Sequence, residues 1–336
     1  MHKLFFVLFI VLVTKNLPAQ ASITPVNLTT EYLINPAGID EKVPRFSWTC
    51  KTNDDRAFGQ KQTAYRIIVS NTESNIHKNI ADAWDSKWIA SDRMQLIAYN
   101  GVPLKSDRTY YWKVQVKDEN GKITNSEIAH WSTGLFEQSA WTAKWIGSSQ
   151  IFTPGVKDCN VDDPWLRKSF SLKSLPKKAT IFVASVGYHE LYVNGKKIGD
   201  GVLNGAVTDH TKRARYIAYD IAGHLIAGKN VIALWLGSSW SIFAAYNTKD
   251  KPRTPIVSAQ ADLYDAGMKR ISRIQTDGSW KVHSSPNRLL GTWEMRHYGG
   301  EIWGANKEIE GWNLASFNDY NWQEATDYNP KLKISA

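Results

Sequence analysis

The dipeptide Asn194-Gly195, which joins two extended runs near the middle of the chain, restricts this region to one kind of structure. Both residues readily adopt positive φ, and the two-residue turn that requires this matches the twist of paired strands. Apolar and polar residues alternate through 190–193 before the loop, and 231–236 is a short apolar run rich in strand-forming residues. We therefore predict a hairpin within an antiparallel β-sandwich, with one buried and one solvated face.

Residues 22–140 predict a first β-sandwich. The strongest pattern is the run 110–117, in which every second residue belongs to one predicted inner face: Tyr110, Trp112, Val114 and Val116. Leu104 followed by Tyr110 fits a tyrosine corner, in which the phenol bonds to loop backbone. Short strands at this spacing are typical of a fibronectin type III-like or immunoglobulin-like module. The default function of such a module is spacing or packing rather than ligand binding.

Residues 141–328 predict a second sandwich, of the jelly-roll or galactose-binding-like kind. Trp141 and Trp145 make the joint between the two modules apolar, so we expect a packed joint rather than a free linker. The tail 329–336 has the pattern of a strand, and we interpret it as the truncated start of a following domain. The predicted fold class is therefore all-β, with two consecutive antiparallel β-sandwiches.

Residues 1–21 have the composition of a secretion signal. A short basic start precedes the apolar run Leu4 to Val13, and Ala19-Gln20-Ala21 is a small-residue cleavage site. The apolar run is too short to span a bilayer, and no longer one follows it. An uncleaved anchor is the alternative. We expect a secreted or periplasmic protein without a membrane span.

Charge and cysteine content narrow the classes of partner. The formal net charge is +9, but the basic residues are scattered and form no stripe interleaved with stacking aromatics. We therefore expect no nucleic-acid partner, while a weak attraction to acidic polysaccharide stays open. With only Cys50 and Cys159, the chain is neither a disulfide scaffold nor a cysteine-based metal site. Its 15 Trp residues suit a sandwich core or a sugar-stacking surface, and composition does not separate these.

Several motifs, in order along the chain, resemble the N-terminal region of bacterial α-L-rhamnosidases of glycoside hydrolase family 78. They include Arg45-Phe46-Ser47-Trp48, Tyr110-Tyr111-Trp112, Trp165 to Phe170, Leu191 to Asp200, Thr208 to Arg213, Tyr219-Asp220-Ile221, Tyr298-Gly299-Gly300-Glu301 and Ser316 to Ala325. The resemblance covers nearly the whole chain after the signal. It implies a fibronectin-like module followed by the rhamnosidase N-terminal β-sandwich. Relatives of this kind remove terminal α-L-rhamnose by inversion, with two carboxylates in an (α/α)6 barrel that follows the sandwiches.

The chain departs from the family pattern where chemistry is expected. The Asp-Cys-Pro and Gly-Trp-x-Gly-Asp motifs of the barrel are missing, so we assign no catalytic residue and expect no hydrolytic centre in this chain. Some relatives carry a calcium-dependent rhamnose site that begins with an Asp-Asn pair, and Val186-Gly187 stands in its place here. Because neither residue offers a side-chain oxygen to calcium, we expect no metal and no cofactor.

Other motifs that could indicate catalysis or metal binding have the wrong spacing or lie in the wrong structural context. The adjacent acids Asp54-Asp55 and Asp162-Asp163 fall in loops and are interpreted as turn formers, because a glycosidase needs carboxylates opposed across a bond. His189-Glu190 lacks the second histidine of a zinc protease. For sugar contact we single out Trp240, Tyr298, Glu301 and Trp303, since indole faces stack on sugars and a carboxylate accepts hydroxyls. The alternative places Trp240 in the core and Glu301 in a surface turn.

Three functions remain open. The first is the non-catalytic N-terminal portion of a secreted α-L-rhamnosidase, whose partner is a catalytic barrel carried elsewhere. The second is a stand-alone protein that binds a rhamnose-containing glycan, and the third is a structural interaction module. Linkage specificity and oligomeric state do not follow from the sequence.

Overall fold

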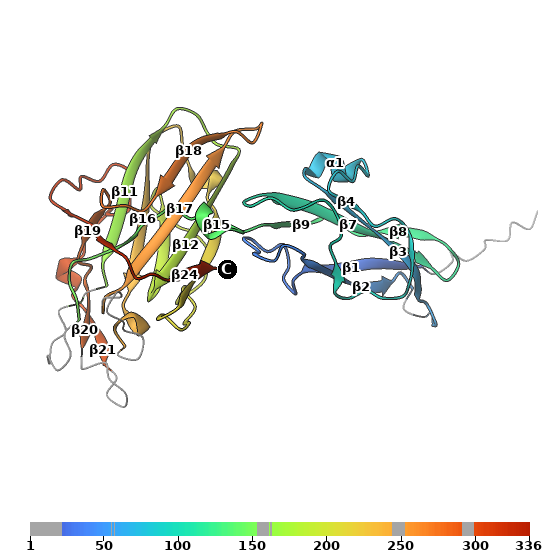
Figure 1. The fold of residues 1–336 in the computed structure, drawn as a ribbon, viewed down its shortest axis with the longest axis horizontal. Helices are drawn as coiled ribbons and strands as arrows, with labels where there is room; N and C mark the ends of the chain where they lie inside the picture. The colour runs from blue at the N-terminus through green and yellow to red at the C-terminus, as the bar shows by residue number, and fades with distance from the viewer. Residues whose placement is uncertain are drawn as a thin grey trace, which may run out of the picture.

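The computed structural model describes residues 22–54, 56, 58–152, 161, 163–243, 253–290 and 299–336. It shows two β-sandwiches arranged along the long axis of the molecule, with the C-terminus between them (Figure 1). Strands account for most of the regular structure, so the predicted all-β class is confirmed. No helix in the described part of the chain has the length and apolarity needed to cross a membrane.

The first sandwich packs a small sheet against a larger one. The small sheet has the order β1 (Ile23–Thr30), β2 (Arg45–Thr52) and β6 (Ile97–Ala98). The larger sheet runs β4 (Trp84–Asp85), β3 (Gln62–Ser70), β7 (Thr109–Asp118) and β8 (Ile123–Asn125), with β5 (Ile89–Ala90) also on β3 and β9 (Ala129–Ser132) also on β7. All of these pairs are antiparallel.

The period of two in β7 gives this sandwich its core, as predicted. Its four inner residues are buried, and the Trp112 ring packs on Phe46 of the small sheet with centroids 4.5 Å apart. The tyrosine corner is also present, because the Lys105 backbone N–H donates to the Tyr110 phenol oxygen at 2.9 Å. This bond fixes the loop before β7, and that loop reaches the second sandwich.

In the described part of the chain, one α-helix interrupts the strands. Helix α1 (Glu73–His77) follows β3, and the Thr72 side chain caps it by accepting from the Asn75 backbone N–H at 3.2 Å. Ile76 is its buried residue. The polar segment 71–79 gave no helical periodicity, and one apolar residue in one turn is too little to produce such a signal.

The second sandwich contains two larger sheets and a short hairpin. One sheet runs β23 (Thr326–Tyr328), β10 (Trp145–Gly147), β17 (Ile256–Tyr264), β12 (Lys178–Val186), β15 (Arg213–Asp220) and β24 (Lys333–Ser335), with β18 (Arg270–Gln275) also on β17. The other runs β14 (Lys196–Lys197), β13 (Tyr188–Val193), β16 (Gly228–Gly237), β11 (Trp165–Leu172), β19 (Lys281–His283) and β22 (Gln323–Glu324). The hairpin pairs β20 (Asn287–Leu290) with β21 (Gly300–Trp303). Short 3₁₀ turns lie at η1 (Gln138–Ala140), η2 (Ala222–His224), η3 (Ser239–Ile242) and η5 (Ala305–Lys307).

The predicted hairpin at Asn194-Gly195 is confirmed and joins β13 to β14. Both residues have positive φ, +50° and +86°. The Asn194 amide donates to His224 O and Asn230 Oδ1, each at 2.9 Å, and its oxygen accepts from Val231 N. The turn residue therefore also holds the start of β16, which explains why asparagine is favoured here beyond its backbone preference.

The outer face of this hairpin's sheet is not fully solvated, contrary to the sequence prediction. The segment that follows β21 folds back over it, and Trp312 stacks on Trp165 of β11 with centroids 4.7 Å apart and planes at 11°. Arg167 of β11 is buried beneath this segment, pairs with Asp319 and donates to Leu314 O at 2.8 Å. Alternation along a strand indicates that its two faces differ in polarity. It does not show whether a segment from later in the chain covers the polar face.

The two sandwiches meet in a tight junction, which supports the expectation of a packed joint. Trp141 stacks on Tyr216 of β15 with centroids 5.7 Å apart, and the Tyr216 hydroxyl donates to Asp40. Gly38 has φ of +74°, and a Cβ there would lie 2.6 Å from the Cβ of Ala218. The junction thus depends on a position where only glycine combines this backbone conformation with this close approach.

The tail forms the expected strand, and its place is in the second sandwich. Strand β24 pairs in parallel with β15, and it is the parallel exception to the antiparallel ladders of the described strands. Ala336 N donates to Asp40 of the first sandwich. The domain limits at 140 and 328, and the assignment of 329–336 to a following domain, stay predictions.

Candidate functional site

Trp303, one of the predicted sugar-contact residues, is part of an exposed aromatic surface. It lies on β21 and is 45% exposed. Its ring centroid is 5.7 Å from that of Trp235 on β16. Glu190 of β13 lies directly opposite Trp235 in the sheet and accepts hydrogen bonds from Tyr192 and Lys197. An indole pair beside a carboxylate is a surface that can stack on a sugar and accept its hydroxyls.

Glu301 and Trp240 lie on neighbouring elements of the same end of the sandwich. Glu301 is exposed on β21, opposite Leu289 of β20. Leu289 packs in a buried cluster with Ile242 of η3, the 3₁₀ turn that carries Trp240. The Trp240 ring is partly buried and contacts Phe243 with centroids 5.2 Å apart. Tyr298 lies outside the described residues, so the sugar contacts assigned to these four residues stay predictions.

A buried carboxylate holds this end of the sandwich together. Asp163 is 3% exposed, and it accepts from Ser238 N and from Asn287 Nδ2, both at 2.6 Å. It thereby ties the start of β11 to the end of β16 and to β20. Burial raises the pKa of the Asp163 carboxyl to about 6, and the charge of Glu301 acts in the same direction.

The interpretation of Asp163 as a turn former is wrong, because its side chain bonds to distant segments rather than to its own loop. Asp54 does behave as a turn former, since it accepts from the Arg56 backbone N–H at 3.0 Å. Their neighbours Asp55 and Asp162 lie outside the described residues.

The backbone is crowded at Gly187, one of the two residues from which we expect no calcium ligand. Gly187 has φ of +99°, and a Cβ there would lie 2.3 Å from Gly237 O. Gly205 has φ of +112°, and a Cβ there would lie 2.5 Å from Gly187 O. A carboxylate at position 187 would therefore displace the end of β16. Among the described residues, no group of three or more His, Cys, Asp or Glu is placed to hold a metal ion.

Beneath these glycines lies a buried polar chain. Ser185 Oγ donates to Gly187 O at 3.0 Å, so its single proton is used there. The His189 Nδ1–H then donates to Ser185 Oγ at 2.8 Å, and His189 Nε2 accepts from the Tyr219 hydroxyl at 3.0 Å. Burial lowers the pKa of His189 to about 3, so the imidazole is neutral and acts as a structural connector.

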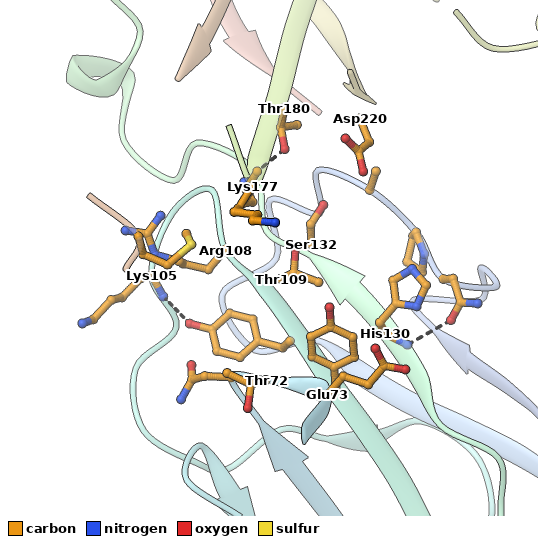
Figure 2. A pocket seen from close by; sticks show the side chains of 18 of the residues that line it. Thr72, Glu73, Lys105, Arg108, Thr109, His130, Ser132, Lys177, Thr180 and Asp220 are labelled. Atoms are coloured by element: carbon orange, nitrogen blue, oxygen red, sulfur yellow. Dashed lines mark hydrogen bonds between the residues drawn. The ribbon is translucent and has the colours of Figure 1, made fainter. Parts of the chain in front are cut away.

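A cleft of about 810 Å³ opens between the two sandwiches (Figure 2). The first sandwich contributes α1, the loop before β7, the start of β7 and the end of β9, and the second contributes the start of β12 and the end of β15. Side chains with hydroxyl, amide and ammonium groups line it, among them Thr72, Thr109, Ser132, Thr180, Asn71 and Lys177. Its volume is in the range of small-molecule sites.

Sequence reasoning considered Asp163 only as a turn former and Glu190 only within a zinc-protease pattern, and it assigned no shared site to the cleft residues. Glu190 carried a signal, because it alternates with buried residues in a strand, but its partner Trp235 is distant in sequence. The cleft had no local signal, since its two walls come from different sandwiches.

Comparison with known proteins identifies both sandwiches. Residues 25–137 match the family described as the Rha78A-like, N-terminal immunoglobulin domain, and residues 174–335 match the alpha-L-rhamnosidase N-terminal domain. An alpha-L-rhamnosidase of Formosa agariphila is 30% identical over 90% of this chain and 33% of its own length. One from Alteromonas sp. (strain LOR) is 29% identical over 87% of this chain and 32% of its own length. The chain thus spans about a third of these curated relatives.

Solved structures agree over both sandwiches. The alpha-L-rhamnosidase from Dictyoglumus thermophilum is 32% identical, with a TM-score of 0.80 over 93% of this chain and 35% of that one. The Streptomyces avermitilis alpha-L-rhamnosidase complexed with L-rhamnose, 19% identical, shares the fold with a TM-score of 0.81 over 94% of this chain and 46% of that one. The chain belongs to the N-terminal domain family of the α-L-rhamnosidases, with an immunoglobulin-type domain followed by the rhamnosidase N-terminal domain.

Proposed function

We propose that the chain is the non-catalytic N-terminal portion of a secreted α-L-rhamnosidase, and that it supports and shapes a catalytic barrel carried on another segment or polypeptide. The observation that carries this proposal is the match of both sandwiches to the N-terminal domains of enzymes about three times as long. The tight junction adds support, because a rigid pair of sandwiches can hold a neighbouring domain at a fixed angle.

The test is complementation. The catalytic region of the Formosa agariphila relative, without the third that corresponds to this chain, would be assayed on nitrophenyl α-L-rhamnoside with and without this protein. We expect no hydrolysis by this chain alone and a gain in activity or thermal stability for the mixture. Robust turnover by this chain alone, abolished by substitution of one of its carboxylates, would overturn the proposal.

Secretion is part of the same proposal and depends on residues 1–21, which lie outside the described residues. Expression in a bacterial host with N-terminal sequencing of the exported protein tests it. We expect a mature protein that begins at Ser22, and retention of the intact leader would contradict the expectation.

A second candidate function is carbohydrate binding by the isolated protein, which the exposed Trp303–Trp235 pair beside Glu190 favours. Saturable binding of rhamnosides that Trp303→Ala abolishes would support it. Tyr320→Ala is the matched control, because Tyr320 is an aromatic residue with 84% exposure whose ring contacts neither Trp303 nor Trp235. Equal loss in both variants would count against a specific site. Failure of both complementation and binding would favour a structural interaction module.

A further inference from the structure

The walls of the interdomain cleft combine ring faces with hydrogen-bonding side chains. Tyr111 of β7 and His130 of β9 lie side by side on the first sandwich, with ring centroids 6.0 Å apart. Hydroxyl and amide groups surround them, and Figure 2 shows Thr109 and Ser132 pointing into the same space. Flat rings surrounded by neutral hydrogen-bonding groups suit the apolar faces and hydroxyl edges of sugar rings.

The cationic side chains that line the cleft differ in whether they already interact with other residues of the protein. Lys178 pairs with Asp107 and donates to Thr180 at 3.0 Å, and the Arg108 guanidinium lies over the Tyr264 ring at 4.9 Å. Lys177 differs, because its ammonium has neither an ion pair nor a hydrogen bond among the described residues. Figure 2 shows its side chain pointing into the cleft, on the side of Thr109 and Ser132.

Two carboxylates also line the cleft and set its balance of charge. Asp220 accepts from the Ala222 backbone N–H at 2.9 Å, which occupies part of its capacity. Glu73 lies in the first turn of α1, on the opposite wall from Lys177 (Figure 2). Lys105 is a further exposed cation of the first wall. The cations therefore outnumber the acids, and the unengaged Lys177 is a direct ligand for an anion.

Both walls of the cleft are fixed before any ligand arrives. The Lys177 backbone N–H donates to Tyr264 O at 2.8 Å, which sets the direction of the chain before β12. The Lys178–Asp107 pair and the Tyr216–Asp40 hydrogen bond then hold the two sandwiches together. A preformed site loses less conformational entropy on binding than one that must assemble.

We propose that this cleft is a binding site for an anionic oligosaccharide, with a carboxylate or sulfate bound by Lys177 and a sugar ring against Tyr111 and His130. The anionic character follows from the lining. The positive net charge, +9 for the full chain and +7 (9 − 2) without Lys3 and Lys15 of the predicted leader, attracts such chains over longer range. The choice of a saccharide rests on the proposed function. A lack of binding would leave the support of a catalytic barrel untouched, because complementation tests that role separately.

The experiment is calorimetric titration of the full chain with three galactan-based oligosaccharides of equal length: neutral, sulfated and uronate-bearing. We expect saturable binding of one or both anionic probes that weakens as salt is added, and much weaker binding of the neutral probe. Comparison of the affinities for the sulfated and the uronate-bearing probes shows whether the site prefers a sulfate or a carboxylate. Binding of the neutral probe with equal affinity would overturn the anionic assignment.

Three charge variants test the geometry. Lys177→Gln should weaken binding about tenfold, as expected for loss of one charge-assisted hydrogen bond. Glu73→Gln should strengthen binding about twofold or more, and because this is a gain, misfolding cannot produce it. Lys229→Gln, at an exposed lysine of β16 outside the cleft, is the control and should leave the affinity unchanged.

The proposal fails if Lys229→Gln weakens binding as much as Lys177→Gln, because the attraction would then be a property of overall charge. It also fails if Glu73→Gln has no effect on an anionic probe that binds the parent protein. Absence of saturable binding for every probe would overturn it outright.

Discussion

The buried carboxylate of Asp163 makes the stability of the second sandwich depend on pH in an unusual direction. An ordinary aspartate has a pKa of about 3.9, whereas burial raises that of Asp163 to about 6. The folded state therefore binds this proton more tightly than the unfolded state. The resulting stabilisation is complete below about pH 4 and is lost as the pH rises through about 6. Two pH units correspond to about 3 kcal/mol of unfolding free energy.

Asp163→Asn removes this titration while preserving the shape of the side chain. The amide oxygen can still accept from Ser238 N, and Asn287 can rotate its amide to present an oxygen to the new NH₂ group. Relative to the parent protein, the variant should therefore gain about 2 kcal/mol between pH 4 and pH 7. Urea unfolding of both proteins at several pH values, followed by tryptophan fluorescence, measures this difference.

Asp85→Asn is a control of opposite sign. The Arg66 guanidinium hydrogen-bonds to Asp85 and holds the pKa of that carboxyl well below its usual range. Its contribution to stability is present above the unfolded-state pKa and is lost as the pH falls through the folded-state value, so this variant should lose stability relative to the parent as the pH rises from 2 to 5. A difference between parent and Asp163→Asn that stays constant with pH, or that runs in the same direction as for Asp85→Asn, would refute the reasoning.

Three further predictions concern the turn and the junction. Asn194→Ala should cost about 2–4 kcal/mol, since it removes three side-chain hydrogen bonds and a residue suited to positive φ; an unchanged urea midpoint would contradict this. Tyr216→Phe should cost about 2 kcal/mol, because it leaves Asp40 Oδ1 and the Leu135 N–H without their partner; calorimetry should show the two sandwiches separating at a lower temperature, and an unaltered thermogram would count against it. Gly38→Ala should lower the melting temperature more than Gly59→Ala, because both positions have positive φ but a Cβ at Gly59 meets nothing within 4 Å; equal shifts would mean that backbone strain, and not the close approach to β15, dominates.

Local signals in the sequence were enough to identify the strand at β7 and the hairpin. The alternation in β7 and the Asn194-Gly195 turn arise from neighbouring residues, because pleating and positive φ are properties of the chain over a few positions. The tyrosine corner belongs to the same class, since Tyr110 bonds to the loop just before it. Helix α1 escaped prediction because a single capped turn with one buried residue carries almost no periodic signal.

Only the tertiary structure decided which side chains are buried and which residues they contact. Alternation along 165–172 places Arg167 on the face opposite Leu166, but its burial depends on Asp319 and Leu314, which follow much later in the chain. Asp163 has the sequence context of a turn former. In the fold its carboxylate is buried and accepts hydrogen bonds from Ser238 and Asn287, which lie far away in the sequence. The cleft exists only because the packed junction fixes two separate domains. Local geometry sets the direction of each side chain, whereas burial and pairing depend on contacts between segments distant in sequence, and no local pattern encodes these.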